Sequence, residues 1–332
     1  MIKKEYLNLY KGQGQTLRNR DQNLPDYEPF IPFDDPENYI ASQELSKAVN
    51  VALALGQPLV ITGEPGTGKT RLASSIAWEC GLNYLEFYTK STSTATDLFY
   101  HYDALRRFQD VQLRQQRPFE EYITCQALGL AILLANPTEE AQRLLPSRLK
   151  NKDPMRSVVL IDEIDKAPRD LPNDVLNEIE KMSFAVKEAQ WEPFEADQKY
   201  RPVLVITSNS EKDLPDAFLR RYVFFHISFP DSQTLKDIVK RRYSRDPEFR
   251  PLLESSFLDN VEKHFDSIRK LNLKKKPAQA ELLAWISILK ALGIDPGDLK
   301  PGDREKVEMS YSVLAKNRDD FDMMKLHLRE MK

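Results

Sequence analysis

Hydrophobic residues along this chain gather in short uninterrupted runs that are separated by longer stretches with helical spacing. Continuous apolar runs at 59–61, 158–161 and 203–207 predict strands buried on both faces, as in a parallel sheet. A further segment, 83–89, alternates between apolar and polar positions and predicts another strand. Because helical patterns separate these runs, we expect an α/β fold with ligands at the carboxyl ends of its strands.

Helical periodicity fills the intervals between the runs and continues after them. Apolar residues recur at helical spacing at 42–55, at 72–78 and over much of 102–153. The same spacing after 231 predicts a smaller all-α domain, and the polar, proline-interrupted start predicts an extended arm. The predicted parts are an arm at 1–35, an α/β domain at 36–230 with an extended insertion at about 102–153, and an α-helical domain with a helical tail at 231–332.

Composition limits the class of protein. The chain has 332 residues, of which 41% are hydrophobic, enough for conventional cores. No apolar stretch approaches the roughly 20 residues that span a bilayer, and the start lacks a signal core, so we expect a cytoplasmic protein. Cys80 and Cys125 lack metal-type spacing. A formal net charge of −3 argues against a strongly basic nucleic-acid surface over the whole molecule, although it leaves room for local basic patches.

A cluster of glycines directly follows the first apolar run. Glycine lets backbone N–H groups turn inward around an anion, and helical spacing resumes at 72, so the order is strand, loop and helix. Lys69 would place its positive charge beside the outer phosphates of a nucleotide, and the Thr70 hydroxyl would be a ligand of Mg²⁺. The predicted phosphate-binding loop consists of Gly63, Glu64, Pro65, Gly66, Thr67, Gly68, Lys69 and Thr70.

Polar residues end two other predicted strands, at the sheet edge where this loop emerges. Asp162 and Glu163 follow the run at 158–161. Asp162 can hold Mg²⁺, and Glu163 can orient and deprotonate a water that attacks the γ-phosphate. Asn209 follows the run at 203–207 and would position that water beside Glu163. The sequence therefore predicts Mg²⁺-dependent hydrolysis of a nucleoside triphosphate, with Thr70 and Asp162 at the metal.

The chain resembles the AAA+ ATPases in the order and spacing of four features. These are the glycine loop, 161–165, Asn209 and the pair Arg220-Arg221. Within that superfamily, the chain looks most similar to the MoxR-like ATPases, in the group with an insert in the second helix. The resemblance covers about 36–290. Its supporting stretches are 39–42, 96–99 with 102–103, 174–181 and 214–221.

The resemblance implies a fold and further site residues. The fold is a P-loop AAA+ parallel sheet flanked by helices and followed by a smaller all-α lid domain, with ATP and Mg²⁺ as cofactors. Arg221 matches an arginine that reaches the γ-phosphate held by a neighbouring subunit, and Arg220 would assist. We also expect Ile40 and Arg71 to contact the nucleotide. The chain lacks the sensing arginine of such lids, for which Lys275 or Lys276 is a substitute candidate.

The resemblance also implies an assembly and partners. We expect a homo-oligomeric ring, a hexamer, in which ATP hydrolysis at subunit interfaces drives remodelling, chaperoning or activation of a client protein. A partner with a von Willebrand A domain is expected by analogy. Two aromatic stretches, 98–102 and 191–194, would face the central pore or an adaptor, although aromatic clusters also commonly pack in cores or between subunits.

Two other functions stay open on the sequence. Basic runs at 240–242 and 274–276 fit a nucleic-acid-directed AAA+ motor, or simply solvated helix ends. A nucleotide-dependent assembly switch with little turnover would keep Lys69 and Asp162 without needing a base or a trans-acting arginine. The presence of Glu163 and Arg221 favours hydrolysis.

Overall fold

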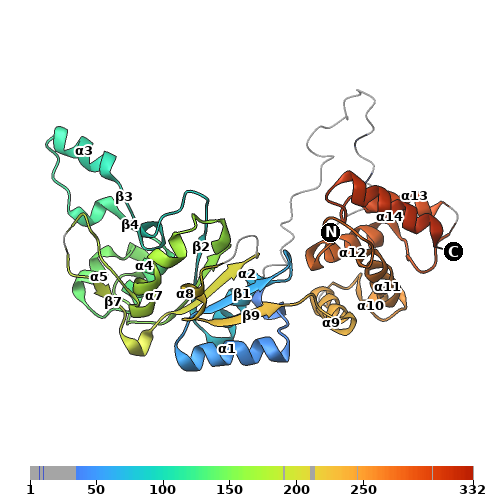
Figure 1. Cartoon of the computed structure of the whole chain (residues 1–332), viewed down its shortest axis with the longest axis horizontal. Helices are drawn as coiled ribbons and strands as arrows, with labels where there is room; N and C mark the ends of the chain where they lie inside the picture. The colour runs from blue at the N-terminus through green and yellow to red at the C-terminus, as the bar shows by residue number, and fades with distance from the viewer. Residues whose placement is uncertain are drawn as a thin grey trace. The chain divides into compact units, whose positions relative to one another are not determined.

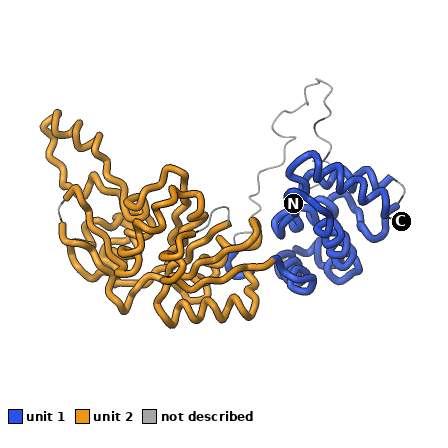
Figure 2. The backbone as a smooth tube through the Cα atoms, viewed as in Figure 1, with its two compact units in different colours: residues 1–38, 229–332 blue, residues 39–228 orange. Residues whose placement is uncertain are grey.

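The computed structural model divides into two compact units, one at 39–228 and the other at 229–332 together with 1–38 (Figure 2). It describes residues 7, 10, 35–189, 191–209, 214–244, 246–300 and 302–331. Apart from residues 7, 10 and 35, the arm expected at 1–35 lies outside the described residues.

A five-stranded parallel sheet forms the centre of the unit at 39–228 (Figure 1). Every residue of its strands β1 and β5 is buried, because helices cover both faces of the sheet. The α/β fold and the four predicted strands are confirmed, and a fifth strand, β9, was not predicted. In spatial order the strands are β2 (Asn83–Tyr88), β5 (Ser157–Asp162), β8 (Val203–Ser208), β1 (Leu59–Gly63) and β9 (Val223–Ile227).

Successive residues of the strands pack against opposite layers, as the two-residue period of a strand requires. Ile61 belongs to a hydrophobic cluster with residues of α1 (Gln43–Leu55) and α2 (Lys69–Cys80). Val60 belongs to the cluster on the other face, with residues of α4 (Ala127–Leu134) and α7 (Leu176–Lys181). The two clusters hold β1 rigidly, and β1 leads into the glycine loop.

Local signals set the ends of the helices beside the sheet. The hydroxyl of Ser42 accepts a hydrogen bond from the Leu45 N–H at 3.1 Å and caps the start of α1. Both α1 and α2 end at a glycine in the left-handed conformation, Gly56 and Gly81. These caps let the chain turn tightly from each helix into the strand that follows it.

The insertion predicted at 102–153 contains strands as well as the expected helices. β3 (Tyr100–Tyr102) pairs antiparallel with β4 (Ile123–Cys125). Between them lie α3 (Ala104–Gln112) and the short turn η6 (Phe119–Tyr122), and Figure 1 shows α3 reaching away from the sheet. α4 then packs on the sheet and α5 (Glu139–Leu144) follows it. The ribbon β3–β4 therefore comes directly before α4 in the chain, and α4 belongs to the core.

Short elements complete this unit. They lie in the connections between successive strands of the sheet, from β2 to β9. They are η5 (Thr96–Leu98), η7 (Ser147–Leu149), η8 (Ile164–Lys166), α6 (Leu171–Asp174), the antiparallel pair β6 (Ser183–Phe184) and β7 (Phe194–Glu195), η9 (Gln198–Tyr200) and α8 (Asp216–Leu219).

We predict that Gly129→Ala strongly destabilises this unit. A Cβ at Gly129 would collide with the backbone carbonyl of Phe99, so α4 could not keep its close approach to the chain before β3. Overpacking of this kind costs about 1–3 kcal/mol, and urea unfolding would measure it. Gly81→Ala is the matched control, because a Cβ there meets nothing within 4 Å and only its left-handed φ of 64° is unfavourable. A smaller loss for Gly129→Ala than for Gly81→Ala would contradict the prediction.

The second unit is helical, as predicted for the chain after 231. Its core is a single hydrophobic cluster in which Trp285 and Tyr311 are fully buried. No helix among the described residues is long and apolar enough to cross a membrane. The helices are η4 (Pro36–Asn38), α9 (Ser232–Tyr243), α10 (Arg250–Leu253), α11 (Phe257–Arg269), α12 (Gln279–Leu292), α13 (Asp303–Ser310) and α14 (Arg318–Glu330).

Candidate functional site

The glycine loop joins the end of β1 to the start of α2, and Gly68 and Gly63 show why its backbone requires glycine. Gly68 has a φ of 90° and is the N-cap of α2 without a side-chain cap, so the first N–H groups of the helix stay available to an anion. At Gly63, with φ of 153°, a Cβ would lie 2.5 Å from the carbonyl oxygen of Ile227 in β9. The turn therefore leaves the first N–H groups of α2 without a side-chain cap at the end of the loop.

Lys69 lies at the centre of this loop. Its ammonium donates hydrogen bonds to the carbonyl oxygens of Gly63 and Glu64, both at 2.9 Å. Burial lowers the pKa of Lys69, and the carboxylates of Asp162, Asp165, Glu163 and Glu64 act in the opposite direction. The ammonium is therefore held between the loop and a group of acidic side chains.

The end of β5 brings Asp162 to the first turn of α2, as predicted. Asp162 Oδ1 accepts hydrogen bonds from the Thr70 hydroxyl at 3.0 Å and from the Thr207 hydroxyl at 2.5 Å. A hydroxyl beside a carboxylate is the hard oxygen donor set that Mg²⁺ prefers. Thr70 and Asp162 therefore fit a magnesium site at the mouth of the loop.

Glu163 follows directly and has an unusual backbone, with φ of 54° and ψ of 52°. A non-glycine residue in this left-handed region is strained and is held there by its surroundings. Its N–H donates to the Thr207 hydroxyl at 2.9 Å, and its Oε1 accepts from Asn209 Nδ2 at 2.8 Å. Its other carboxylate oxygen pairs with the ammonium of Lys166. Glu163 and Asn209 are thus brought together as the sequence predicted.

Three residues of this cluster were not predicted from the sequence. Thr207 is fully buried and bridges Asp162 to the backbone of Glu163. Asp165 accepts a hydrogen bond from the Asn209 N–H at 3.2 Å, and Lys166 pairs with Glu163. The sequence offered only a weak signal for Thr207, the hydroxyl that ends the run at 203–207, because threonine is also an ordinary strand residue.

The residues before α1 approach the loop from one side. A Cβ at Gly68 would lie 3.2 Å from Cε2 of Tyr39, so the Tyr39 ring lies against the turn. Burial raises the pKa of Tyr39 well above its ordinary value. Ile40 follows it and is half-buried, as is Arg71 in the first turn of α2. The predicted nucleotide contacts of Ile40 and Arg71 stay predictions.

The two predicted arginines lie apart from the cluster. Arg220 and Arg221 are exposed after α8, and Arg221 Nε pairs with Glu180 at 3.6 Å. Within the described residues, neither arginine contacts Asp162, Glu163 or Lys69 of its own chain. Their predicted role at a neighbouring subunit's nucleotide stays a prediction.

The aromatic stretch 98–102 is mainly core, so its interpretation as a pore-facing surface is wrong. Leu98, Phe99 and Tyr100 are buried, and Phe99 stacks on Phe184 of β6 with ring centroids 5.5 Å apart. In the second stretch Phe194 is buried as well. The alternative of core packing is therefore the correct one for these rings, because they join the insertion to the hairpin β6–β7.

Comparison with known proteins gives the family. The profile of the ATPase family associated with various cellular activities (AAA) matches residues 59–231, more than half of the chain. The chain belongs to the AAA family. The match begins with β1 and the glycine loop and ends just after β9, so the cluster around Lys69 lies inside the AAA domain. The AAA domain is thus the nucleotide-binding ATPase part of the chain.

Solved structures with some similarity include two mutants of RuvB from Thermotoga maritima. Each is 16% identical to this AAA protein over 84% of this chain and 79% of the RuvB chain, with TM-scores of 0.38 and 0.39. No curated protein matched significantly.

Proposed function

We propose that this AAA protein is a MoxR-like ATPase that hydrolyses Mg²⁺-bound ATP at the subunit interfaces of a ring, a hexamer, and thereby remodels or activates a partner protein. The observation that carries the proposal is the coupled cluster of Lys69, Thr70, Asp162, Glu163 and Asn209 at one edge of the sheet. It contains each group that hydrolysis of a triphosphate requires within one chain, except a cation for the charge of the transition state.

In the proposed mechanism, the loop N–H groups and Lys69 bind the phosphates, and Thr70 with Asp162 would hold Mg²⁺. Bound Mg²⁺ would supply positive charge that offsets the charge of the phosphates. Thr207 orients Asp162 through its 2.5 Å hydrogen bond. Glu163 takes the proton of the attacking water, and the amide of Asn209, 2.8 Å from Oε1 of Glu163, fixes the direction of this carboxylate.

The missing cation would come from a neighbouring subunit. Arg221 is exposed and its only ion pair among the described residues is with Glu180, itself exposed, at 3.6 Å. Exposed pairs of this kind are worth about 0–1 kcal/mol, so Arg221 could exchange Glu180 for a phosphate with little loss. Arg220 lies beside it and would assist.

The subgroup assignment is supported by the ribbon β3–β4 with α3, which projects immediately before α4. The MoxR-like group named above carries an insert in the second helix of the AAA+ core. In this chain the helix at that place is α4, not the element labelled α2. The hairpin β6–β7 packs on the base of this insert through Phe99 and Phe184. Movement at the nucleotide could therefore be passed to the insert and to a client protein, and we propose a partner with a von Willebrand A domain by analogy.

The basic runs give a nucleic-acid motor little support. Arg241 donates to the Glu37 carbonyl at 2.7 Å, Arg242 is only 8% exposed, and Lys274 pairs with Asp319. Arg241 and Arg242 are therefore less available to phosphates of a nucleic acid, whereas the exposed pair with Asp319 holds Lys274 only weakly.

Phosphate release from ATP separates the proposal from its rivals. We expect release without nucleic acid, and a higher rate with a genuine partner protein such as a von Willebrand A domain protein. Stimulation by DNA or RNA that falls steeply with salt would instead indicate a nucleic-acid motor. A rate equal to that of Glu163→Gln under every condition would indicate an assembly switch.

Mixing two inactive variants tests the shared site. Arg221→Ala subunits lack the donated cation and Glu163→Gln subunits lack the base, so each alone should be inactive. Mixed rings contain some interfaces with an intact Glu163 on one side and an intact Arg221 on the other, and we expect partial recovery of phosphate release. If no mixing ratio restores activity, while mixing either variant with the wild type does give active rings, Arg221 does not act across the interface.

A further inference from the structure

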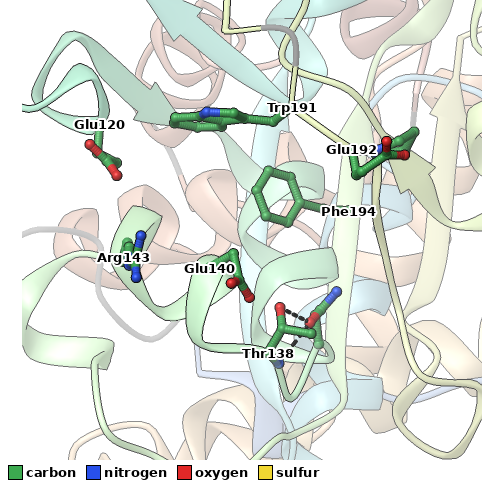
Figure 3. A pocket seen from close by; sticks show the side chains of 9 residues that line it. Glu120, Thr138, Glu140, Arg143, Trp191, Glu192 and Phe194 are labelled. Atoms are coloured by element: carbon green, nitrogen blue, oxygen red, sulfur yellow. Dashed lines mark hydrogen bonds between the residues drawn. The ribbon is translucent and has the colours of Figure 1, made fainter.

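A pocket of about 560 Å³ lies in the AAA domain among elements that carry none of the nucleotide-site residues (Figure 3). It is formed by α5 and the residues before it, by η6 of the insertion, and by the chain leading into β7. This volume is typical of binding sites for small groups. The lining residues that matter here are Glu120, Glu140, Arg143, Trp191, Glu192 and Phe194.

One wall of the pocket is aromatic and rigid. Trp191 is half-buried and makes edge contacts with Phe119 and Phe194, whose ring centroids lie 5.5 and 6.3 Å away. Phe194 is itself held against Phe184 of β6. The indole therefore has a fixed orientation while part of its surface stays open to the pocket.

The facing wall is acidic. In Figure 3, Glu120, Glu140 and Arg143 lie across from the two aromatic rings. With Glu192, the lining has three carboxylates and a single guanidinium. Within the described residues, none of these four side chains forms an ion pair or a hydrogen bond. The lining thus carries a net negative charge, with three carboxylates against one guanidinium.

The floor of the pocket is fixed by Asn136. Its Oδ1 accepts hydrogen bonds from the Thr138 N–H at 2.9 Å and from the Thr138 hydroxyl at 2.6 Å (Figure 3). Its Nδ2 donates to the carbonyl oxygen of Glu195 in β7 at 2.8 Å. This amide ties the start of α5 to the chain that carries Trp191, so the acidic and aromatic walls keep their spacing. A preorganised pocket loses less entropy when it binds.

The geometry points to a binding site for an arginine side chain presented by a partner protein, with the guanidinium between the indole of Trp191 and the carboxylates of Glu120 and Glu140. A planar guanidinium stacks on an aromatic ring and is matched bidentately by carboxylates, which an ammonium cannot do. The same acidic wall repels a nucleic acid. The charge of the pocket therefore selects a basic protein segment, and the assignment does not depend on the ATPase mechanism.

Fluorescence of Trp191 gives a direct test with the full chain. The probe is the blocked peptide acetyl-Gly-Arg-Gly-amide, and its isostere with citrulline, which has no charge, is the comparison. Trp78 is 59% exposed and is replaced in the Trp78→Phe background, whereas Trp285 is fully buried and should not respond. We expect a saturable change with the arginine peptide that weakens with salt, and binding of the citrulline peptide about tenfold weaker.

Variants of the pocket test the charge argument in both directions. Glu140→Gln should weaken binding of the arginine peptide several-fold, whereas Arg143→Gln should strengthen it because a competing cation is removed. A gain of affinity cannot result from misfolding. Glu305→Gln removes one exposed carboxylate from the other unit and should change nothing. Equal binding of both peptides, tighter binding of a matched Glu peptide, or loss of binding in Arg143→Gln would overturn the proposal.

Discussion

Lys69→Ala should reduce the affinity for ATP by at least about a hundredfold. The ammonium of Lys69 is buried at the centre of the loop and donates to two loop carbonyls, and it would exchange one or both for phosphate oxygens. Hydrogen bonds to charged groups are worth about 1.5–3 kcal/mol each, so the loss of two is sufficient for this effect. Competition against a fluorescent ATP analogue would measure the affinity.

Two controls make this result specific. Lys47→Ala removes an exposed lysine from α1 of the same unit and should leave the affinity unchanged. Thermal unfolding of Lys69→Ala should show a cooperative transition, which would establish that the domain is still folded. Wild-type affinity in a folded Lys69→Ala chain would show that the phosphates bind elsewhere.

Glu163→Gln should bind ATP nearly as well as the wild type while its rate of phosphate release falls by about 10²–10⁴, the usual contribution of a general base. Glutamine keeps the shape of the side chain and an oxygen that can accept from Asn209 Nδ2, so the binding site should be preserved. What it loses is the ability to take a proton. Single-turnover phosphate release with saturating ATP would measure the effect.

Lys166→Gln is the matched control for this prediction. It removes the ion pair with Glu163 and leaves the carboxylate and its hydrogen bond to Asn209 intact. We expect hydrolysis to stay within a few-fold of the wild type. If Glu163→Gln hydrolyses ATP at the wild-type rate, or if both variants lose activity equally, Glu163 is not the base.

The central part of the fold was predictable because strands that are buried on both faces consist of consecutive apolar residues. β1, β5 and β8 are covered on both faces, so their residues form continuous apolar runs. β9 is an edge strand whose residues are mostly exposed or half-buried, with Phe224 53% exposed, and its short run gives a weaker pattern. The ribbon β3–β4 was not predicted because each of its strands has only three residues, and the segments next to them have the apolar spacing of helices.

The site was predictable to the extent that single chain segments encode it. Lys69 and Thr70 are defined by their spacing from the glycines, and Asp162 and Asn209 by their positions after strands. Thr207 could not be recognised in the same way, because threonine is also an ordinary strand former and only the fold reveals its contact with Asp162. The aromatic stretch 98–102 was misinterpreted for the same reason, because the burial of a ring depends on partners far along the chain, such as Phe184.

Phosphate release by the full chain with ATP is the most direct test of the claim that this cluster is an ATP-hydrolysing site. Three samples are compared at the same concentration: the wild type with Mg²⁺, the wild type with EDTA, and Glu163→Gln with Mg²⁺. Release that saturates with ATP in the first sample alone is the expected outcome. Equal release in all three, or no release in any of them with or without a partner protein, would contradict the claim.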